Sequence, residues 1–314
     1  RERRRLDRGP AGADGLTRRR TVVLAASVIA LVAVAAGVAV RRTSSSDTSD
    51  ASDAAADAGV VAPHDGRFVV ECTWSNSARV DPIVHYGMAG MSHLHEFFGA
   101  VGVDESTTVD DLVDADTTCR NKEDRASYWA PALYDGDRRI EPSGSNAYYR
   151  AAPGVDPTTV VPFPLGLKML GGNQFSTEEQ NTDIVGFSCG FNPRRHAAPP
   201  DCGEGSPLRV RVTYPDCWDG EHLDDPIDHT SHMAYSDADG CPDSHPVAVP
   251  QLEFIIEYPF SGDASNLRLA SGETFTAHAD FFNAWDPEAL ATDVRYCINA
   301  DVVCGVAQLG PHGS

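Results

Sequence analysis

The chain has 314 residues, and its 46 acidic side chains outnumber its 25 lysines and arginines, which gives a formal net charge of −21. Residues 1–42 hold ten arginines and three acids, so the remaining residues carry 15 basic and 43 acidic side chains, a balance near −28. Such a surface repels nucleic acid, whose binding needs clustered basic side chains, and it favours solubility and cation-rich surroundings.

The first 59 residues fall into three segments of different composition. Residues 1–20 are basic and polar, and they are expected to form a cytoplasmic tail. Residues 21–40 form an uncharged apolar run that is long enough to cross a bilayer, with arginines on both sides. Because the larger basic excess precedes this run, the sequence predicts a single-pass membrane anchor with the C-terminal part outside the cytoplasm. Residues 41–59 are rich in Ser, Asp and Ala and predict a disordered linker.

A protein secreted after signal-peptide cleavage is the alternative topology. Ala33-Val34-Ala35 offers a small-residue cleavage pattern, and residues 19–24 weakly resemble a twin-arginine export signal. The apolar run continues past the cleavage pattern, which favours an uncleaved anchor.

Residues 60–314 are expected to form one exported domain that is mainly β, with the architecture of a β-sandwich or jelly roll with long loops and few short helices. Short apolar or alternating segments predict strands, and no repeat divides the domain. Asp286 and Pro287 suit the N-cap and first turn of a helix. The predicted strands are residues 67–72, 127–130, 208–214, 251–258 and 274–278, and the predicted helices are residues 108–115 and 287–299.

All eight cysteines follow the apolar run, so the even count predicts that every cysteine is in a disulfide. The absence of any Cys-x-x-Cys spacing argues against a zinc ribbon or a thioredoxin-like redox site. Spacing suggests only the pair Cys297 and Cys304, and the other pairings stay open.

Three histidine-bearing pairs are predicted to line one site. His93 and His95 are two residues apart, as are His278 and Asp280, so each pair would share one face of a strand. His229 and His232 are three apart, which would place them together on a helical turn. Imidazole and carboxylate groups at such spacings are typical of transition-metal sites, with zinc or copper as the cofactor. The candidate metal ligands are His93, His95, His229, His232 and His278.

Other polar and aromatic side chains complete the predicted site. Asp228 would orient a histidine, and Glu96 and His245 are available as supporting or acid–base groups. The residues proposed for catalysis are His93, His95, Asp228, His229, His232, His278 and Asp280, and those proposed for substrate binding are Trp218, Tyr235, His245, Trp285 and Asp286. The alternative is that the histidines are hydrogen-bonded structural pairs and that the tryptophans pack in the core.

Several motifs, taken in order, resemble the family catalogued as domain of unknown function 1996 (DUF1996). They include Arg-Val-Asp-Pro-Ile-Val at residues 79–84, Ser-His-Leu-His at 92–95, Tyr-Trp-Ala-Pro at 128–131 and Pro-Asp-Cys-Trp-Asp-Gly at 215–220. Residues 163–173, 228–235, 241–247 and 278–286 continue the resemblance, which covers the chain from about residue 67 to 286. The chain departs from the family pattern at Glu96, Ala279 and Ala284. The resemblance implies a membrane-anchored member of actinobacterial type.

What the resemblance implies about function is limited, because the family is named for its unknown function. It groups the histidine-bearing segments, and it points by association to cell-wall or extracellular polysaccharide, since fungal members occur beside carbohydrate-binding WSC modules. The sequence therefore leaves three hypotheses. They are a hydrolase or lyase acting on glycan, with or without a metal; a non-catalytic glycan- or metal-binding module on a membrane stalk; and, least favoured, a copper oxidase or monooxygenase with Met233 as a soft ligand.

Overall fold

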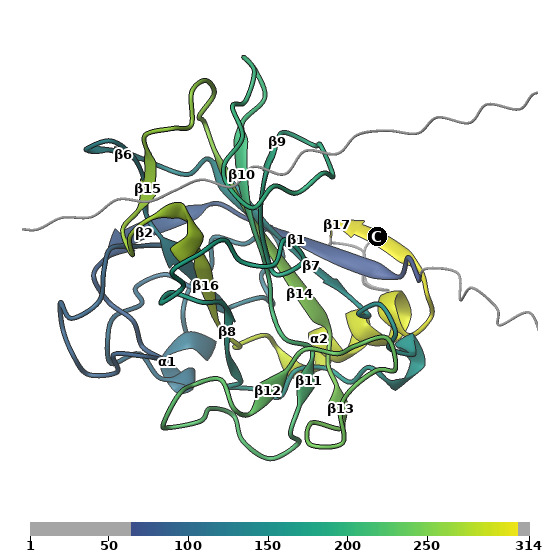
Figure 1. Cartoon of the computed structure of the whole chain (residues 1–314). Coiled ribbons are helices and arrows are strands. Elements are labelled where there is room, and N and C mark those ends of the chain that lie inside the picture. Colours follow the sequence, from purple (N-terminus) through teal and green to yellow (C-terminus); the bar gives the residue numbers. More distant parts are fainter. Residues whose placement is uncertain (1–63, 307–314) are drawn as a thin grey trace, which may run out of the picture. The chain divides into compact units, whose positions relative to one another are not determined.

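Two β-sheets that pack face to face form the framework of residues 64–306, the part of the chain that the computed structural model describes (Figure 1). The first sheet has the order β17 (Val303–Val306), β1 (Arg67–Cys72), β7 (Gly144–Arg150), β14 (Gln251–Tyr258), β10 (Leu208–Thr213) and β9 (Val185–Cys189). The second has the order β2 (Trp74–Ala78), β3 (His95–Gly99), β4 (Ser127–Pro131), β16 (His278–Phe282) and β8 (Lys168–Gly172).

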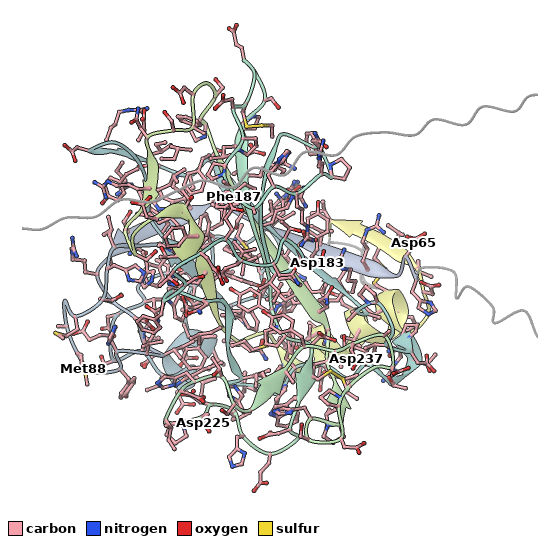
Figure 2. The ribbon with its side chains drawn as sticks, viewed as in Figure 1. Asp65, Met88, Asp183, Phe187, Asp225 and Asp237 are labelled. Atoms are coloured by element: carbon pink, nitrogen blue, oxygen red, sulfur yellow. A yellow bond between two sulfur atoms is a disulfide. The ribbon has the colours of Figure 1, made fainter. Side chains whose placement is uncertain are left out.

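Alternation of side chains along these strands builds the core between the sheets. In β14, Leu252, Phe254 and Ile256 face inward, because residues two apart in a strand share a face. Phe254 stacks on Tyr128 of β4, with ring centroids 5.2 Å apart, so the two sheets are in direct contact. Figure 2 shows side chains filling this space, with Phe187 of β9 among them, whereas the exposed Met88 projects at the edge of the domain.

The outer face of the five-stranded sheet is covered by its own small apolar cluster. Phe97 and Trp129 project outward from β3 and β4. They are covered by Ile83, which lies between β2 and β3, and by Leu112, which lies between β3 and β4. Leu112 belongs to α1 (Val109–Val113), which begins at the Thr108 N-cap with a capping box. The apolar cluster does not extend over the polar residues at one end of this outer face, and those residues form a separate site.

Smaller elements extend the framework. One three-stranded sheet has the order β12 (Met233–Ala234), β11 (Cys217–Trp218) and β13 (Val247–Ala248). A second three-stranded sheet has the order β15 (Leu267–Leu269), β5 (Leu133–Asp135) and β6 (Arg138–Ile140). The remaining helical segments are η1 (Pro157–Thr159), η2 (Thr274–Thr276), α2 (Pro287–Asp293) and η3 (Val294–Ile298).

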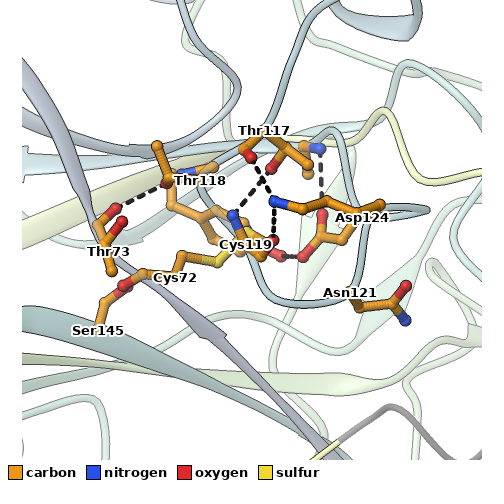
Figure 3. Close-up of a disulfide and its surroundings, with 12 residues drawn as sticks. Cys72, Thr73, Thr117, Thr118, Cys119, Asn121, Asp124 and Ser145 are labelled. Carbon is orange, nitrogen blue, oxygen red and sulfur yellow. Dashed lines mark hydrogen bonds between the residues drawn. A yellow bond between two sulfur atoms is a disulfide. The ribbon is translucent and has the colours of Figure 1, made fainter.

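Four disulfides join all eight cysteines, as the even count predicts. Cys297 pairs with Cys304, which was the one pairing that spacing suggested. Figure 3 shows the bond between Cys72, at the end of β1, and Cys119. The Lys122 ammonium donates to the Cys119 carbonyl. The other two bonds are Cys189–Cys202 and Cys217–Cys241. These bonds indicate an extracellular or secreted domain, because disulfides persist in oxidising compartments.

The structure confirms the mainly β fold with few short helices and corrects some of its details. Residues 67–72 and 251–258 are strands with the predicted bounds, and Asp286 caps α2. The predicted strand at 274–278 is wrong in its first part, because residues 274–276 form η2 and β16 begins only at His278. The predicted anchor at residues 21–40 lies outside the described residues. Within residues 64–306, every helix is too short or too polar to span a membrane.

Candidate metal centre

Two histidines lie in one row across the outer face of the five-stranded sheet. His95 of β3 is paired in register with Pro131 of β4, and the antiparallel register of β4 and β16 places Pro131 opposite His278. Both imidazoles project to the outer face, on the side of Phe97 and away from the core between the sheets. The two rings lean toward each other over Pro131, and their centroids are 6.0 Å apart.

His93 completes a cluster of three imidazoles. It precedes β3, and its ring centroid lies 4.2 Å from that of His95 and 5.1 Å from that of His278. Each of the three side chains offers a nitrogen within 4.8 Å of the nitrogens of the others. His95 and His278 are buried and His93 is half-buried, so most of the exposed surface of the cluster belongs to His93. We call His93, His95 and His278 the histidine triad.

The backbone fixes the tautomers of two triad members. Nδ1 of His95 lies 3.0 Å from the carbonyl oxygen of Val80, and Nδ1 of His278 lies 2.8 Å from that of Thr276. A carbonyl oxygen can only accept, so both neutral rings carry their proton on Nδ1 and keep a lone pair on Nε2. Metal-binding histidines are held in this way, with the far nitrogen bonded to a carbonyl and the near one free.

Local sequence explains why these two carbonyl groups are in place. The Asp81 carboxylate accepts hydrogen bonds from the backbone N–H groups of Ile83 and Val84, both at 3.0 Å, which fixes the turn that follows Val80. Asp81 belongs to the family motif at residues 79–84, but its spacing in the sequence does not predict this role. The Thr276 carbonyl comes from the last residue of η2, the turn that replaces the predicted start of β16.

Asp280 lies beside the triad on the same face of β16. Its Oδ2 is 4.0 Å from Nε2 of His278, and the side chain is buried. Burial raises the pKa of Asp280 well above its usual range, and the charge of Asp81 adds to the rise. Three polar atoms of this site are buried without a hydrogen-bond partner among the described residues, namely Nε2 of His93, Nε2 of His95 and Oδ2 of Asp280.

The triad is built to stay neutral. Burial, together with the neighbouring His278, lowers the pKa of His93 to about 3. Burial likewise lowers the pKa of His278 to about 4, and it holds the pKa of His95 well below its ordinary value. Neutral imidazole is the form that binds metal ions.

The structure does not bring His229 and His232 into the triad. Nε2 of His232 lies 2.7 Å from the carbonyl oxygen of Lys168, and Nδ1 of His229 lies 2.8 Å from Oδ1 of Asp224. Lys168 pairs with Phe282, four residues along β16 from His278 and therefore about 13 Å away. The predicted helical turn does not form, because His229 has a φ of 58° and the segment is an irregular loop.

Asp228 and His245 make local contacts rather than contacts with the triad. The Asp228 carboxylate accepts from the backbone N–H groups of Thr230 and Ser231 at 2.8 Å, and the Ser231 hydroxyl also donates to it, which lowers its pKa. It therefore orders its own turn and does not orient a histidine. His245 contacts the carbonyl oxygen of Ser231 through Nε2 at 3.0 Å.

Glu96 and Met233 also lie away from the triad. Glu96 follows His95 in β3 and so points to the opposite face, where it accepts from Nε1 of Trp74 at 2.8 Å. Met233 is buried in β12 opposite Trp218, which leaves it no place as a copper ligand beside the triad.

The aromatic residues predicted to bind substrate divide into buried and accessible ones. Trp285 is only 1% exposed and donates from Nε1 to the Tyr149 hydroxyl, so it is a core residue and offers no face to a sugar. Asp286 accepts from the N–H groups at the start of α2 and is a helix cap. Trp218 is half-buried and Tyr235 is 38% exposed, so both keep accessible ring surface.

Two other groups of metal-binding residue types occur, but both contain disulfides. Cys72 and Cys119 lie near Asp124, and Cys217 and Cys241 lie near Asp216. Oxidised cysteines offer no thiolate, so among the described residues the histidine triad is the one group with free ligand atoms.

Comparison with known proteins places the triad inside a family domain. The sequence profile described as "Domain of unknown function (DUF1996)" matches residues 81–285, which include all three histidines and Asp280. No curated protein and no solved structure matches the chain.

Proposed function

This chain belongs to the DUF1996 family, and we propose that it is an extracytoplasmic metalloprotein in which His93, His95 and His278 bind one zinc or copper ion. Three histidine ligands with an open position, as in several zinc enzymes, leave room for a water molecule or a substrate atom. Asp280 is then the acid–base group of the site, since it is held beside His278 and is not needed to complete the ligand set.

The observation that carries this proposal is the set of unpartnered buried atoms at the triad. Leaving a buried polar atom without a partner costs about 1–3 kcal/mol, and native proteins rarely accept several such atoms in one place. Here Nε2 of His93 and of His95 are both orphaned within reach of His278. One cation satisfies these lone pairs together, whereas ring packing alone satisfies none of them.

We propose extracellular polysaccharide as the substrate, acted on by hydrolysis or by lyase-type elimination. The support is the exported, disulfide-bonded domain, the accessible rings of Trp218 and Tyr235, and the acid–base group at Asp280. When bound by the triad, a cation would supply Lewis-acid polarisation of a sugar oxygen in either reaction, and Asp280 would accept or donate the proton. Attachment to the membrane through residues 21–40 belongs to the same proposal, and it would hold the domain close to the cell wall.

Metal binding tests the first part of the proposal. The full chain is stripped with chelator, reloaded with Zn²⁺ or Cu²⁺ and analysed for metal per protein chain, beside His93→Ala and His232→Ala variants. His232 is a buried histidine outside the triad and is the matched control. We expect one equivalent in the wild type and in His232→Ala, and none in His93→Ala. A wild type that retains no metal, or a His93→Ala protein that retains a full equivalent, contradicts the proposal.

Turnover tests the second part. Metal-loaded wild type and Asp280→Asn are incubated with neutral and acidic wall glycans, and new reducing ends and new carbon–carbon double bonds are measured. Hydrolysis yields only reducing ends, whereas elimination also yields the double bond. Asp280→Asn should keep its metal and lose roughly 10²–10⁴-fold in rate. If the wild type binds a glycan without cleaving it, the domain is a binding module instead of an enzyme.

A further inference from the structure

The opposite face of the domain carries a hollow that the histidine site does not use. It lies over the outer face of the six-stranded sheet, and its volume is about 420 Å³. We call it the arginine hollow, because five arginines line it: Arg67, Arg150, Arg195, Arg209 and Arg211. Cavities of this size hold small organic ligands, and the apolar surfaces of Tyr148 and Ile255 form part of the lining.

Strand periodicity explains how these arginines come together. Arg209 and Arg211 alternate in β10 with Val210 and Val212, which are buried in the core, so both arginines face outward. Arg195 arrives from the loop after β9 and lies against Gly186, where an added Cβ would be 2.9 Å from the Cβ of Arg195. A glycine at this position therefore admits the arginine to the hollow.

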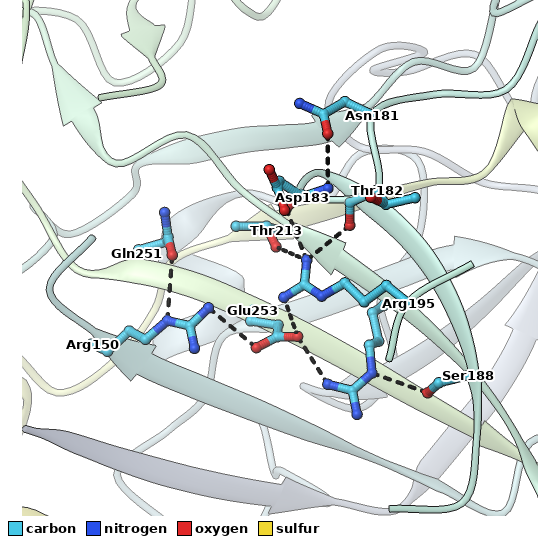
Figure 4. Close-up of polar contacts among 10 residues, drawn as sticks. Arg150, Asn181, Thr182, Asp183, Ser188, Arg195, Thr213, Gln251 and Glu253 are labelled. Atoms are coloured by element: carbon cyan, nitrogen blue, oxygen red, sulfur yellow. Dashed lines mark hydrogen bonds and ion pairs between the residues drawn. The ribbon is translucent and has the colours of Figure 1, made fainter. Parts of the chain in front are cut away.

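One carboxylate is shared by three guanidinium groups in the hollow (Figure 4). Oε1 of Glu253 lies 2.8 Å from Nη2 of Arg195 and 3.1 Å from Nη1 of Arg211. Its Oε2 lies 3.4 Å from Nη2 of Arg150. Glu253 orders the arginines, but one negative charge does not neutralise three positive ones.

The remaining charges leave the hollow positive. The five arginines of the lining meet three carboxylates, those of Asp65 and Glu253 in the lining and that of Glu257, which pairs with Arg209, in a chain whose net charge is −21. Arg67 is paired in register directly opposite Arg150, and like charges in such cross-strand pairs are destabilising. Burial lowers the pKa of Arg150, and the nearby arginines lower it further against the opposing effect of Glu253. A bound anion would offset this repulsion.

The guanidinium donors are also only partly used. Arg150 donates from Nε to Gln251, and Arg211 donates from Nε to Ser188, while each uses one further nitrogen on Glu253. Among residues 64–306, Nη1 of Arg150 and Nη2 of Arg211 have no acceptor. Planar guanidinium forks of this kind match the two oxygens of a carboxylate or the oxygens of a phosphate.

We propose that the arginine hollow is a second binding site, which takes the carboxylate or phosphate group of an acidic sugar. The arginines bind the oxyanion, and the rings of Tyr148 and Phe191 border the sugar. The guanidinium carbon of Arg209 lies 4.1 Å from the ring centroid of Phe191. Phe191 is 89% exposed, so a face of its ring is available at the rim. Because this site is separate from the triad, its binding requires neither metal nor turnover.

Calorimetric titration of the metal-free full chain tests the proposal with two matched ligand pairs. Trigalacturonate is compared with its fully methyl-esterified form, and glucose 1-phosphate with glucose. We expect binding of at least one anionic member and none of its neutral partner. Arg67→Gln and Arg211→Gln should each weaken binding by about tenfold or more, because each removes a charge-assisted hydrogen bond.

The control is Arg138→Gln, which removes the same charge from a side chain that is 66% exposed in β6, a strand of another sheet. It should bind as the wild type does, and so should His93→Ala, which lacks a triad ligand. Thermal unfolding of every variant confirms that it is folded. The proposal is overturned if neither anion binds, if the neutral partners bind equally well, or if Arg138→Gln weakens binding as much as Arg67→Gln. Success or failure here is independent of the metal result.

Discussion

At the scale of single residues, the position of each free ring nitrogen separates the histidines that meet in the triad from those that do not. His95 and His278 each bind a carbonyl oxygen through Nδ1, which leaves Nε2 free and directed toward the triad. His232 uses Nε2 on the Lys168 carbonyl, and His229 uses Nδ1 on Asp224, so each also keeps one ring nitrogen that is free, but neither nitrogen lies in the triad. Residue spacing predicted all four as candidates, but the direction of a ring depends on the backbone around it.

A second residue-scale feature is a buried polar chain in the core. Nε1 of Trp285 donates to the Tyr149 hydroxyl at 3.1 Å, the Tyr149 and Tyr128 hydroxyls share a short hydrogen bond, and the Tyr128 hydroxyl donates to Asp124 at 2.7 Å. Burial raises the pKa of Asp124 to about 7, although the hydrogen bonds from Tyr128 and Ala126 lower it in part. The carboxyl group is therefore protonated in the folded protein over a range of pH in which the unfolded chain has released that proton.

This pKa predicts how stability depends on pH. An unperturbed aspartate has a pKa of about 3.9, so the folded state binds one more proton than the unfolded state between about pH 4 and pH 7. The free energy of unfolding should fall by roughly 4 kcal/mol over that window through Asp124 alone and then level off. Asp124→Asn cannot ionise and should lose this part of the dependence.

Denaturant unfolding of wild type and Asp124→Asn at pH 5 and pH 8 measures the effect. The difference in unfolding free energy between the two proteins should shift in favour of the variant as the pH rises. The control is Asp110→Asn, at an exposed position on α1, which should follow the wild type. Parallel curves for wild type and Asp124→Asn would show that Asp124 is ionised in the folded protein.

At the scale of elements, the close approach of β8 to the start of β16 positions His278. Gly172 has a φ of +76°, and a Cβ there would lie 2.7 Å from the Ala277 carbonyl oxygen and 3.1 Å from the Cα of His278. Only glycine meets both requirements, because other residues rarely adopt this backbone conformation and their Cβ would collide with the adjacent strand. Packing of two strands is therefore part of the geometry of the triad.

Gly172→Ala should disturb both stability and the triad. We expect a loss of about 2–4 kcal/mol, from left-handed backbone strain and from displacement of residues 277 and 278. Gly87→Ala is a matched control, since Gly87 has a φ of +70° but nothing lies within 4 Å of its added Cβ. It should lose only about 1 kcal/mol and bind metal normally. Chemical unfolding and metal titration of both variants check this, and equal effects at the two glycines would exclude the role of close packing.

Local patterns in the sequence predicted the elements that depend on local interactions. The alternation in residues 208–213 and the apolar run in 251–258 predicted strands, and Thr108 and Asp286 predicted helix starts. β7 was missed because Gly-Ser-Asn-Ala-Tyr-Tyr-Arg has weak strand character by itself and is held by β1 on one side and β14 on the other. Pairing with the two neighbouring strands therefore compensates for the weak strand propensity of the β7 sequence.

The candidate site was predictable to a similar extent. The two-residue spacing of His278 and Asp280 placed both on one face of β16, as a strand requires. The sequence does not predict the non-local contacts, which include the pairing of Cys72 with Cys119 and the hydrogen bonds from the triad histidines to backbone carbonyl groups. The arginine hollow was also missed, although the outward alternation of Arg209 and Arg211 was its signal in the sequence.

At the scale of the whole molecule, the disulfides link segments that are distant in the chain. Cys72–Cys119 closes a loop with a sequence separation of 47, whereas Cys297–Cys304 closes one of 7. Loop-closure entropy predicts stabilisation of about 4 kcal/mol for the longer loop and about 2.4 kcal/mol for the shorter one. Unfolding of Cys72→Ala/Cys119→Ala and Cys297→Ala/Cys304→Ala should reproduce this order. A larger loss from the second pair would mean that the bonds act mainly through native contacts.

The same sandwich presents different chemistry on its two outer faces. The five-stranded sheet carries neutral histidines, for which we propose a cation, and the six-stranded sheet carries an excess of arginines, for which we propose an anion. Both faces use the positions that alternate with core residues, so the fold can hold two sites without weakening its interior. The proposed function depends on the first of these sites.

X-ray absorption spectroscopy at the metal edge of the reloaded full chain tests that site most directly. Our proposal predicts one metal per chain with three imidazole nitrogens at about 2.0–2.1 Å and no sulfur ligand, and no bound metal in His93→Ala treated in the same way. A wild-type protein that holds no metal after reloading, or a coordination shell of oxygens without three imidazoles, would contradict the account and leave the triad a packed structural cluster.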